Sequence, residues 1–394
     1  EPVITATLSQ ELSDMEANDL IRINIALRDQ YDAESLQAST RNLSAETKRN
    51  IAINELKAFS ARTQSSLLNM LHSYESLGSV KNIKPFWIAN VINCYATPEL
   101  IEVLALRNDV WFIDYDQEYQ MIDPGSYEDS EEIMNPEGIT EITWNVSKVN
   151  APQVWDLGFK GEGIVVSVLD TGVNYNHNDI KNNMWEHPDY PYHGWNYIAN
   201  NNNPMDDHGH GTHCAGTVAG DGTSGSQTGV APKAKIMAMK ILNSQGGGTP
   251  GGVWSGIEFS VDNGAHVLSL SLGWTNASNS DRQVWRNTFN NALAAGVISA
   301  VAAGNEGNMQ WLYPIPNNVR TPGNVPPPWL HPDQTLTGGT SGVMSIGATN
   351  SNDGLAGFSG RGPVTWQSVP TYNDYAYNPG MGLIRPDVVA PGDN

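Results

Sequence analysis

Residues 164–172 read IVVSVLDTG, an apolar run that ends in an acid and a glycine turn. Comparable apolar runs recur at residues 234–242, 267–272, 297–302 and 343–348. Near-continuous apolar strands are typical of a parallel sheet that is buried on both faces by helices. We therefore predict an α/β domain with a parallel sheet and helices on both faces over this part of the chain.

A second segment, residues 206–216, reads DDHGHGTHCAG. Two glycines bracket His210, and the small residues that follow can start a tightly packed helix. A helix N-terminal turn fixes the angle of an imidazole, as a catalytic base requires. His208, His210 and His213 are close enough in sequence to suggest a metal site, but their spacing matches no HExxH-type pattern. Asp170, at the end of its strand, lies where α/β proteins place their sites, although alone it could be a plain cap.

Residues 302–307 read AAGNEG and follow the strand at 297–301. An asparagine beside glycines at a strand end can aim its amide into a cleft. Asn305 alone would be only a turn signal. Together with Asp170 and His210, it is a candidate donor to an oxyanion.

The segments VLDTG, GHGTHCAG, SLSLG and AAGNEG occur in the order and contexts of the subtilisin family of serine proteases. In that family the catalytic groups follow in the chain order Asp, His, Ser. The resemblance implies a serine endopeptidase in which Asp170 orients His210, His210 is the general base and Asn305 binds the oxyanion. It also implies that His177 and His213 are structural and that Cys214, beside the base, is a free cysteine.

The resemblance further implies a substrate cleft made by three short segments. Ser271, Leu272 and Gly273 would form one wall of the pocket for the residue before the cleaved bond. Ala303 and Gly304 would form the opposite side of that pocket. The edge strand that pairs with the substrate main chain would be Gly246, Gly247 and Gly248.

The first part of the chain reads as a small α/β module. Residues 20–27 alternate as a strand with one buried face, and residues 44–77 form a long helical stretch between Ser44 and the stop signal Gly78. Residues 83–95 favour two strands or one bent strand, Pro98 opens a short helix, and residues 110–115 form a final strand. The order β-α-β-β-α-β is ferredoxin-like.

Such a module resembles the prodomain of subtilisins, which assists folding and blocks the cleft with its tail. We therefore expect a ferredoxin-like α+β prodomain over residues 1–122, an acidic linker over 123–143, and a subtilisin-like catalytic domain over 144–394. Processing is expected between residues 118 and 143, so the chain represents an unprocessed form with its own prodomain as an intramolecular inhibitor.

The family's serine lies in a GTSMA-type motif, which this sequence does not contain. Residues 385–394, RPDVVAPGDN, resemble the segment shortly before that motif. We therefore expect the serine in sequence beyond residue 394 or in a separate C-terminal fragment, and this chain alone to be inactive. Ser341, in a GTSG stretch, is expected to be a loop residue. The alternative function is a non-catalytic protein of the same fold that binds peptides or a partner in its cleft.

The composition limits the partners. With 21 Lys+Arg against 42 Asp+Glu, the net charge of −21 argues against nucleic acid as a partner. The sequence contains no run of 18 apolar residues, so we expect no membrane span. Cys94 and Cys214 are too few for a disulfide framework or a zinc cluster. Protein or peptide substrates and a secreted location fit the family.

Two further expectations concern loops. No cofactor is expected for catalysis, but a structural calcium ion fits the family, with Asp206, Asp207 and residues 200–203 as oxygen donors. Residues 309–337 carry seven prolines and two tryptophans. This segment could form a lip over the cleft or be an ordered surface insertion, and we weigh the two equally.

Overall fold

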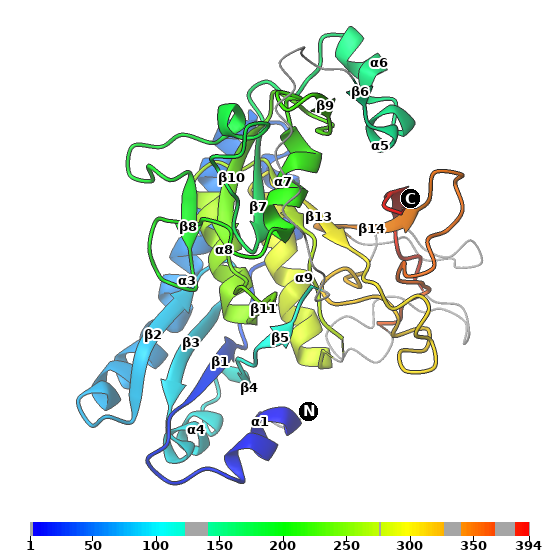
Figure 1. Ribbon diagram of the computed structural model, residues 1–394. Coiled ribbons are helices and arrows are strands. Elements are labelled where there is room, and N and C mark those ends of the chain that lie inside the picture. The colour runs from blue at the N-terminus through cyan, green and yellow to red at the C-terminus, as the bar shows by residue number, and fades with distance from the viewer. Residues whose placement is uncertain (1–2, 123–140, 276, 327–339, 367–382, 394) are drawn as a thin grey trace.

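The computed structural model describes residues 3–122, 141–275, 277–326, 340–366 and 383–393. A seven-stranded sheet forms the larger part of the molecule (Figure 1), and each neighbouring pair of its strands is parallel. The five strands predicted from the apolar runs are all present, and two short ones add to them. In spatial order the strands are β15 (Val388–Pro391), β14 (Val343–Thr349), β13 (Ile298–Ala302), β12 (Val267–Leu270), β7 (Val165–Asp170), β10 (Lys235–Lys240) and β8 (Gly194–Asn196).

Helices pack on both faces of this sheet. Successive side chains of a strand point to opposite faces, and β7 shows the consequence: Val168 packs with the helix α7 (His210–Ala219), whereas Leu169 packs with the helix α8 (Pro250–Asp262). The helix α9 (Asn279–Ala294) continues the α8 layer beside β13. The predicted α/β class and parallel sheet are confirmed.

One part of the α7 face is uncovered among the described residues. The register places Ile298, Met344 and Val388 on the same face as α7, on three neighbouring strands. Their exposed fractions are 52%, 44% and 46%. Parallel sheets are normally covered on both faces, so this apolar surface is a place where a further segment can pack.

The N-terminal module is a four-stranded antiparallel sheet in the order β2-β3-β1-β4. The elements follow the predicted order β-α-β-β-α-β, with residues 83–95 divided between two strands. They are β1 (Ile21–Leu27), α3 (Ala45–Glu75), β2 (Val80–Phe86), β3 (Val91–Ala96), α4 (Pro98–Ala105) and β4 (Val110–Tyr115), with α1 (Ala6–Leu12) before them and α2 (Ala33–Thr40) between β1 and α3.

The helix starts of this module agree with their sequence signals. The Ser44 hydroxyl accepts from the Thr47 amide at the start of α3, and the Thr97 hydroxyl accepts from the Leu100 amide at the start of α4. Each cap satisfies one backbone donor that the first turn leaves unpaired.

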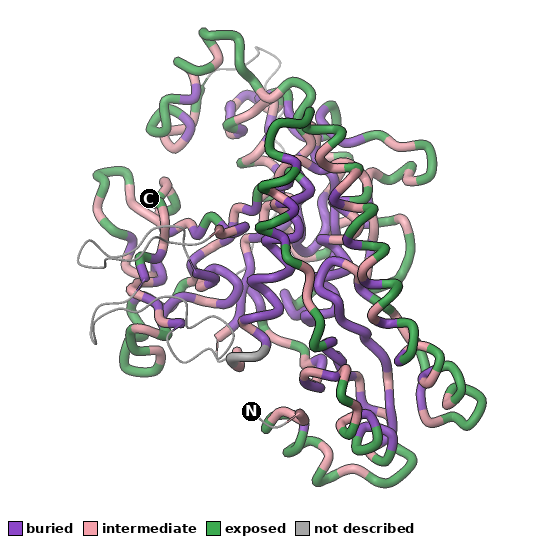
Figure 2. Tube along the Cα trace, turned by 180° about the vertical axis from the view of Figure 1, so that it is seen from behind, coloured by how far each residue is buried: buried purple, intermediate pink, exposed green. Residues whose placement is uncertain are grey.

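The prediction that β1 buries only one face is wrong. Ile23 and Ile25 pack under α3 and α4, as expected, but Asn24 on the opposite face is also only 4% exposed. That face packs against α8 and α9, which lie between the two sheets (Figure 1). Buried residues run through the middle of the molecule, and exposed residues lie around its outside (Figure 2). An isolated strand pattern cannot show a second buried face that a distant part of the chain covers.

The remaining elements are short. They are β5 (Tyr119–Gln120), β6 (Glu141–Ile142), α5 (Trp144–Lys148), α6 (Ala151–Asp156), the 3-10 turn η1 (Lys181–Asn183), β9 (Ser226–Gln227) and β11 (Gly247–Gly248). Most of the predicted linker, residues 123–140, lies outside the described residues. Among the described residues, no helix combines the length and the apolar character needed to cross a membrane.

Candidate active site

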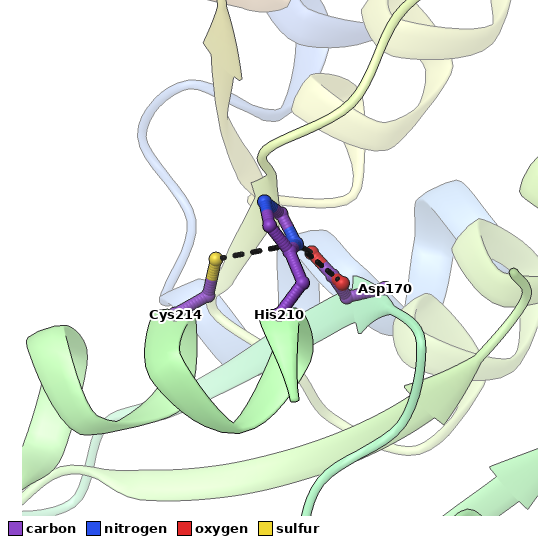
Figure 3. A group of neighbouring side chains, drawn as sticks. All are labelled: Asp170, His210 and Cys214. Atoms are coloured by element: carbon purple, nitrogen blue, oxygen red, sulfur yellow. Dashed lines mark hydrogen bonds and ion pairs between the residues drawn. The ribbon is translucent and has the colours of Figure 1, made fainter. Parts of the chain in front are cut away.

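Asp170 and His210 face one another across the top of the sheet. Asp170 is the last residue of β7, and His210 is the first residue of α7. The Nδ1 atom of His210 lies 2.7 Å from Oδ1 and 2.9 Å from Oδ2 of Asp170 (Figure 3). The carboxylate is almost fully buried, and it fixes the imidazole so that Nε2 points to the other side of the ring.

Glycines let these two elements approach so closely. Gly209 precedes α7 at φ 100°, a left-handed conformation that glycine adopts without strain. A side chain at Gly211 would place its Cβ 2.0 Å from the Gly172 carbonyl oxygen and 3.1 Å from Cβ of Asp170. The GHG and DTG segments are therefore required by the packing of the pair as well as by its chemistry.

The Asp170 carboxylate stabilises positive charge on the imidazole. Burial lowers the pKa of His210, but the hydrogen bond and charge of Asp170 outweigh it, so that the pKa is raised well above 6.5. Stabilisation of the imidazolium is what a base needs as it takes a proton. Cys214 lies one turn further along α7, with Sγ 3.8 Å from Nδ1 of His210, and burial raises the pKa of its thiol. Neither cysteine forms a disulfide.

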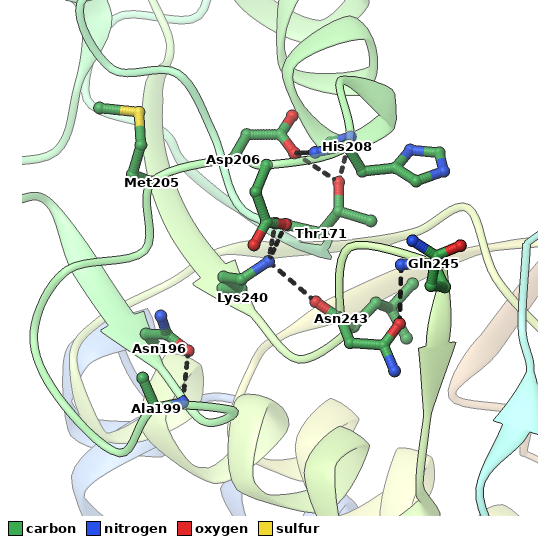
Figure 4. A network of polar contacts seen from close by, with 12 residues as sticks. Thr171, Asn196, Ala199, Met205, Asp206, His208, Lys240, Asn243 and Gln245 are labelled. Carbon is green, nitrogen blue, oxygen red and sulfur yellow. Dashed lines mark hydrogen bonds and ion pairs between the residues drawn. The ribbon is translucent and has the colours of Figure 1, made fainter. Parts of the chain in front are cut away.

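A polar network supports the start of α7 (Figure 4). The Asp206 carboxylate accepts from the backbone of His208, Gly209 and Thr212 and from the Thr171 hydroxyl. Buried Lys240 donates from Nζ to Oδ1 of Asp207 at 2.6 Å.

Both aspartates expected to bind calcium thus have other partners, and the network they form holds the base in place. A structural calcium ion stays a prediction, which thermal unfolding with and without a chelator would test.

A cavity of about 170 Å³ lies beside the imidazole. Four of the predicted site residues besides His210 line it, namely Asn305, Ser271, Leu272 and Gly304. Ala303 is buried behind the wall with 1% exposure, and its neighbour Ala302 lines the cavity instead. The other lining residues, which the sequence did not single out, are Met121, Ile122 and Arg320.

The remaining predicted residues contact the end of the N-terminal module. The strand β11, Gly247–Gly248, pairs antiparallel with β5, Tyr119–Gln120. The Met121 amide donates to the Gly246 carbonyl at 3.1 Å, and the Gly273 amide donates to the Met121 carbonyl at 3.0 Å. Residues 119–122 therefore lie between two segments predicted to bind substrate, and we call them the tail segment.

Side chains add to this main-chain pairing. The Tyr119 ring stacks on Trp274 with centroids 5.5 Å apart, and Gln120 donates from Nε2 to the Gln245 carbonyl at 2.7 Å. Met121 and Ile122 are 0% and 3% exposed. The second half of the tail segment is thus buried in the cleft, whereas Gln120 is exposed.

His213, His177 and Ser341 are not among the residues that line the cavity. Burial lowers the pKa of His213, which lies on α7 beyond the base. His177 accepts from the Asp179 amide in the loop after β7. Ser341 precedes β14 and bonds to the Val343 backbone, at the amino end of the sheet, whereas the site is at the carboxyl end.

The comparisons with known proteins agree with this geometry. The model of the subtilase family, Peptidase_S8, matches residues 161–394. Thermitase of Thermoactinomyces vulgaris is 32% identical over 250 residues, which cover 61% of this chain and 77% of thermitase. M-protease of Shouchella clausii (strain KSM-K16) is 26% identical over 393 residues, 97% of this chain and 87% of that protein.

A third relative, the minor extracellular protease Vpr of Bacillus subtilis (strain 168), is 38% identical over 181 residues. The match covers 44% of this chain but only 21% of Vpr. The family model covers more than half of the chain, and it spans the β7 acid, the α7 base and the walls of the cleft. The chain belongs to the subtilase family of serine proteases.

Proposed function

We propose that this chain is the precursor form of a secreted serine endopeptidase, with its nucleophilic serine in sequence that follows residue 394. The observation that carries the proposal is the tail segment, which lies in the cleft as an extended peptide beside His210. It forms strand pairs with Gly247–Gly248 and a hydrogen bond with Gly273, as a substrate main chain would.

The chemistry follows from the groups around the cavity. His210, oriented by Asp170, takes the proton of the serine hydroxyl while the serine oxygen attacks the peptide carbonyl. Asn305, which lines the cavity, donates to the oxyanion that forms. His210 then gives the proton to the leaving amine. Water next attacks the acyl carbon while His210 takes its proton, and His210 returns that proton to the serine oxygen as the acyl–oxygen bond breaks.

The uncovered apolar surface is evidence that a further segment of the protein packs on the sheet. Ile298, Met344 and Val388 are exposed on the α7 face, the face from which His210 is presented. A helix packed there would remove this surface from water, and its N-terminus would lie toward the carboxyl ends of the strands. We propose that the serine-bearing segment is this cover, joined to the chain or present as a separate fragment.

The N-terminal module acts in this proposal as the inhibitor of its own catalytic domain. It buries the tail segment in the cleft, and processing between residues 118 and 143 releases it. The secreted location is supported by the extracellular relative Vpr. Protein or peptide substrates follow from the family, and a non-catalytic peptide-binding role is the alternative that the experiment must exclude.

The test is hydrolysis of an unfolded protein substrate by a protein that extends beyond residue 394 and contains the serine. Unsubstituted protein is expected to hydrolyse the substrate, and His210→Ala is expected to lose at least about 10³-fold of the activity, since the base and the nucleophile act as a unit. His177→Ala, outside the site, is the matched control and should retain activity. Absence of hydrolysis by the unsubstituted protein after the module is removed would favour the non-catalytic alternative.

A further inference from the structure

Arg320 occupies the space between the two walls of the cleft. Its side chain is 12% exposed and lines the cavity beside the tail segment. A Cβ added at Gly273 would lie 2.8 Å from Cβ of Arg320, and one added at Gly304 would lie 2.6 Å from its Cγ. The arginine stem therefore fills the gap that these two glycines leave.

The backbone holds Arg320 rigidly at this place. Its amide donates to the Ala303 carbonyl at 2.9 Å. The next residue, Thr321, exchanges two backbone hydrogen bonds of 2.9 Å with Trp274. The segment is thus fixed to both walls, and Arg320 forms the floor of the cavity between them.

An ion pair fixes the guanidinium. Nε and Nη2 of Arg320 lie 2.7 and 2.5 Å from Oε1 of Glu306, whose side chain is 5% exposed. The other oxygen of Glu306 accepts from the backbone N–H of Asn305 at 2.9 Å. This carboxylate therefore connects the floor of the cavity to the residue that lines its catalytic end.

The guanidinium also reaches the peptide in the cleft. Nη1 of Arg320 donates to the Met121 carbonyl at 3.2 Å, the same oxygen that accepts from the Gly273 amide. A charge-assisted hydrogen bond to a main-chain carbonyl is available to any peptide bound in this register.

We propose that Arg320 is the specificity-determining residue of the cleft. It closes the floor of the pocket, so that substrates carry a short, uncharged or acidic side chain before the cleaved bond, and it binds a main-chain carbonyl of the peptide. Large aromatic side chains meet the arginine stem, and lysine or arginine meets its charge. The inference deepens the proposed function and rests on it for the choice of substrate.

The first experiment needs no catalysis and uses the chain of 394 residues. Amide hydrogen exchange is measured at Met121 and Gly273 in the unsubstituted chain and in Arg320→Met with Glu306→Gln. This double variant keeps the apolar stem of Arg320 and the length of Glu306, and it leaves no buried carboxylate unpaired. Both amides are expected to exchange at least about tenfold faster, as the loss of one charge-assisted hydrogen bond predicts. Arg361→Met, which lies outside the cavity lining, is the control and should leave both rates unchanged.

The second experiment measures kcat/KM of the serine-bearing protein on peptides that differ only in alanine or phenylalanine before the cleaved bond. The unsubstituted protein is expected to prefer alanine, and Arg320→Ala should raise the phenylalanine-to-alanine ratio by about tenfold or more, because the pocket deepens. The Arg320→Met, Glu306→Gln variant should keep the alanine preference because the stem remains.

An unchanged ratio in Arg320→Ala, or unchanged exchange in the double variant, would overturn the inference and leave a purely structural ion pair. If no peptide is hydrolysed by any of the proteins, the proposed function fails. The exchange measurement still decides whether Arg320 holds the peptide in the cleft.

Discussion

The N-terminal module touches the sheet domain through two different contacts. Its sheet and the helices α2 and α3 pack broadly on α8 and α9, whereas its tail segment enters the cleft mainly through backbone hydrogen bonds. The broad contact uses groups that only this module carries. The tail contact uses a main chain that any extended peptide could offer.

The broad contact depends on two carboxylates, one buried (Asp116) and one partly buried (Glu258). Asp116 of the module accepts from the Gly251 amide in the first turn of α8 at 3.0 Å. In the opposite direction, Glu258 of α8 accepts from the amides of Trp87 and Ile88. In the proposed precursor, a specific broad contact and a generic tail contact would let the module stay docked while its tail competes with substrates.

The largest expected effect is at Asp116. Its carboxylate also accepts from Asn24 and Asn93 and forms an ion pair with Arg22 at 3.0 Å. Asp116→Ala would leave these donors buried without their acceptor and is expected to destabilise the chain by about 3–5 kcal/mol in urea unfolding. Asp109→Ala, which breaks a half-exposed ion pair with Arg107, should cost at most about 1 kcal/mol. Equal effects of the two substitutions would show that the broad contact is not specific.

The tail contact is tested separately at Gly246. A Cβ there would lie 2.4 Å from Cγ1 of Ile122, and the residue has φ +78°. Gly246→Ala is expected to displace the tail segment, at a cost of about 1–3 kcal/mol, and to speed hydrogen exchange at Met121 without undocking the module.

Gly158→Ala is the matched control for this substitution, since Gly158 has φ +92° and nothing within 4 Å of an added Cβ. It introduces similar backbone strain without a clash, so tail exchange should stay slow. Slow exchange in Gly246→Ala would mean that the tail is not held where the strand pairing puts it.

A smaller effect concerns the pH dependence of docking. Burial raises the pKa of Glu258 from 4.5 to about 8, although the two amides it accepts from lower it. The folded chain therefore holds a proton that the unfolded chain releases above 4.5, and stability falls as the pH rises through this window. In Glu258→Gln the free energy of unfolding should decrease less between pH 4.5 and about 8.

Part of the dependence should remain in that variant, because burial also raises the pKa of Asp281 to about 8. The check is urea unfolding of both chains at several pH values. Identical pH profiles would show that Glu258 does not titrate in the folded chain within this range.

The features that the sequence could predict are those with a local pattern. The long apolar strands, the β-α-β-β-α-β order and the acid, base and asparagine segments all have local patterns, and the structure brings Asp170, His210 and Asn305 to one end of the sheet. The short strands β8 and β15 have three and four residues, too few for a periodic pattern.

Residues whose role depends on distant contacts could not be predicted. Arg320 is one arginine in a proline-rich segment. Nothing near it in the sequence indicates that its side chain lies in the cleft between Gly273 and Gly304. The alternation of residues 20–27 predicts one exposed face, but Asn24 on that face is 4% exposed because the face packs against α8 and α9. The lip suggested for residues 309–337 stays a prediction, since 327–339 lie outside the described residues, while Trp311 is 80% exposed.

The intact mass of the serine-bearing protein after folding shows whether the precursor processes itself. Two species separated by a cut between residues 118 and 143 are expected for the unsubstituted protein, and one uncut chain is expected for His210→Ala. A single uncut chain for both proteins, or the same cut in both, would contradict a precursor that processes itself with His210 as its base.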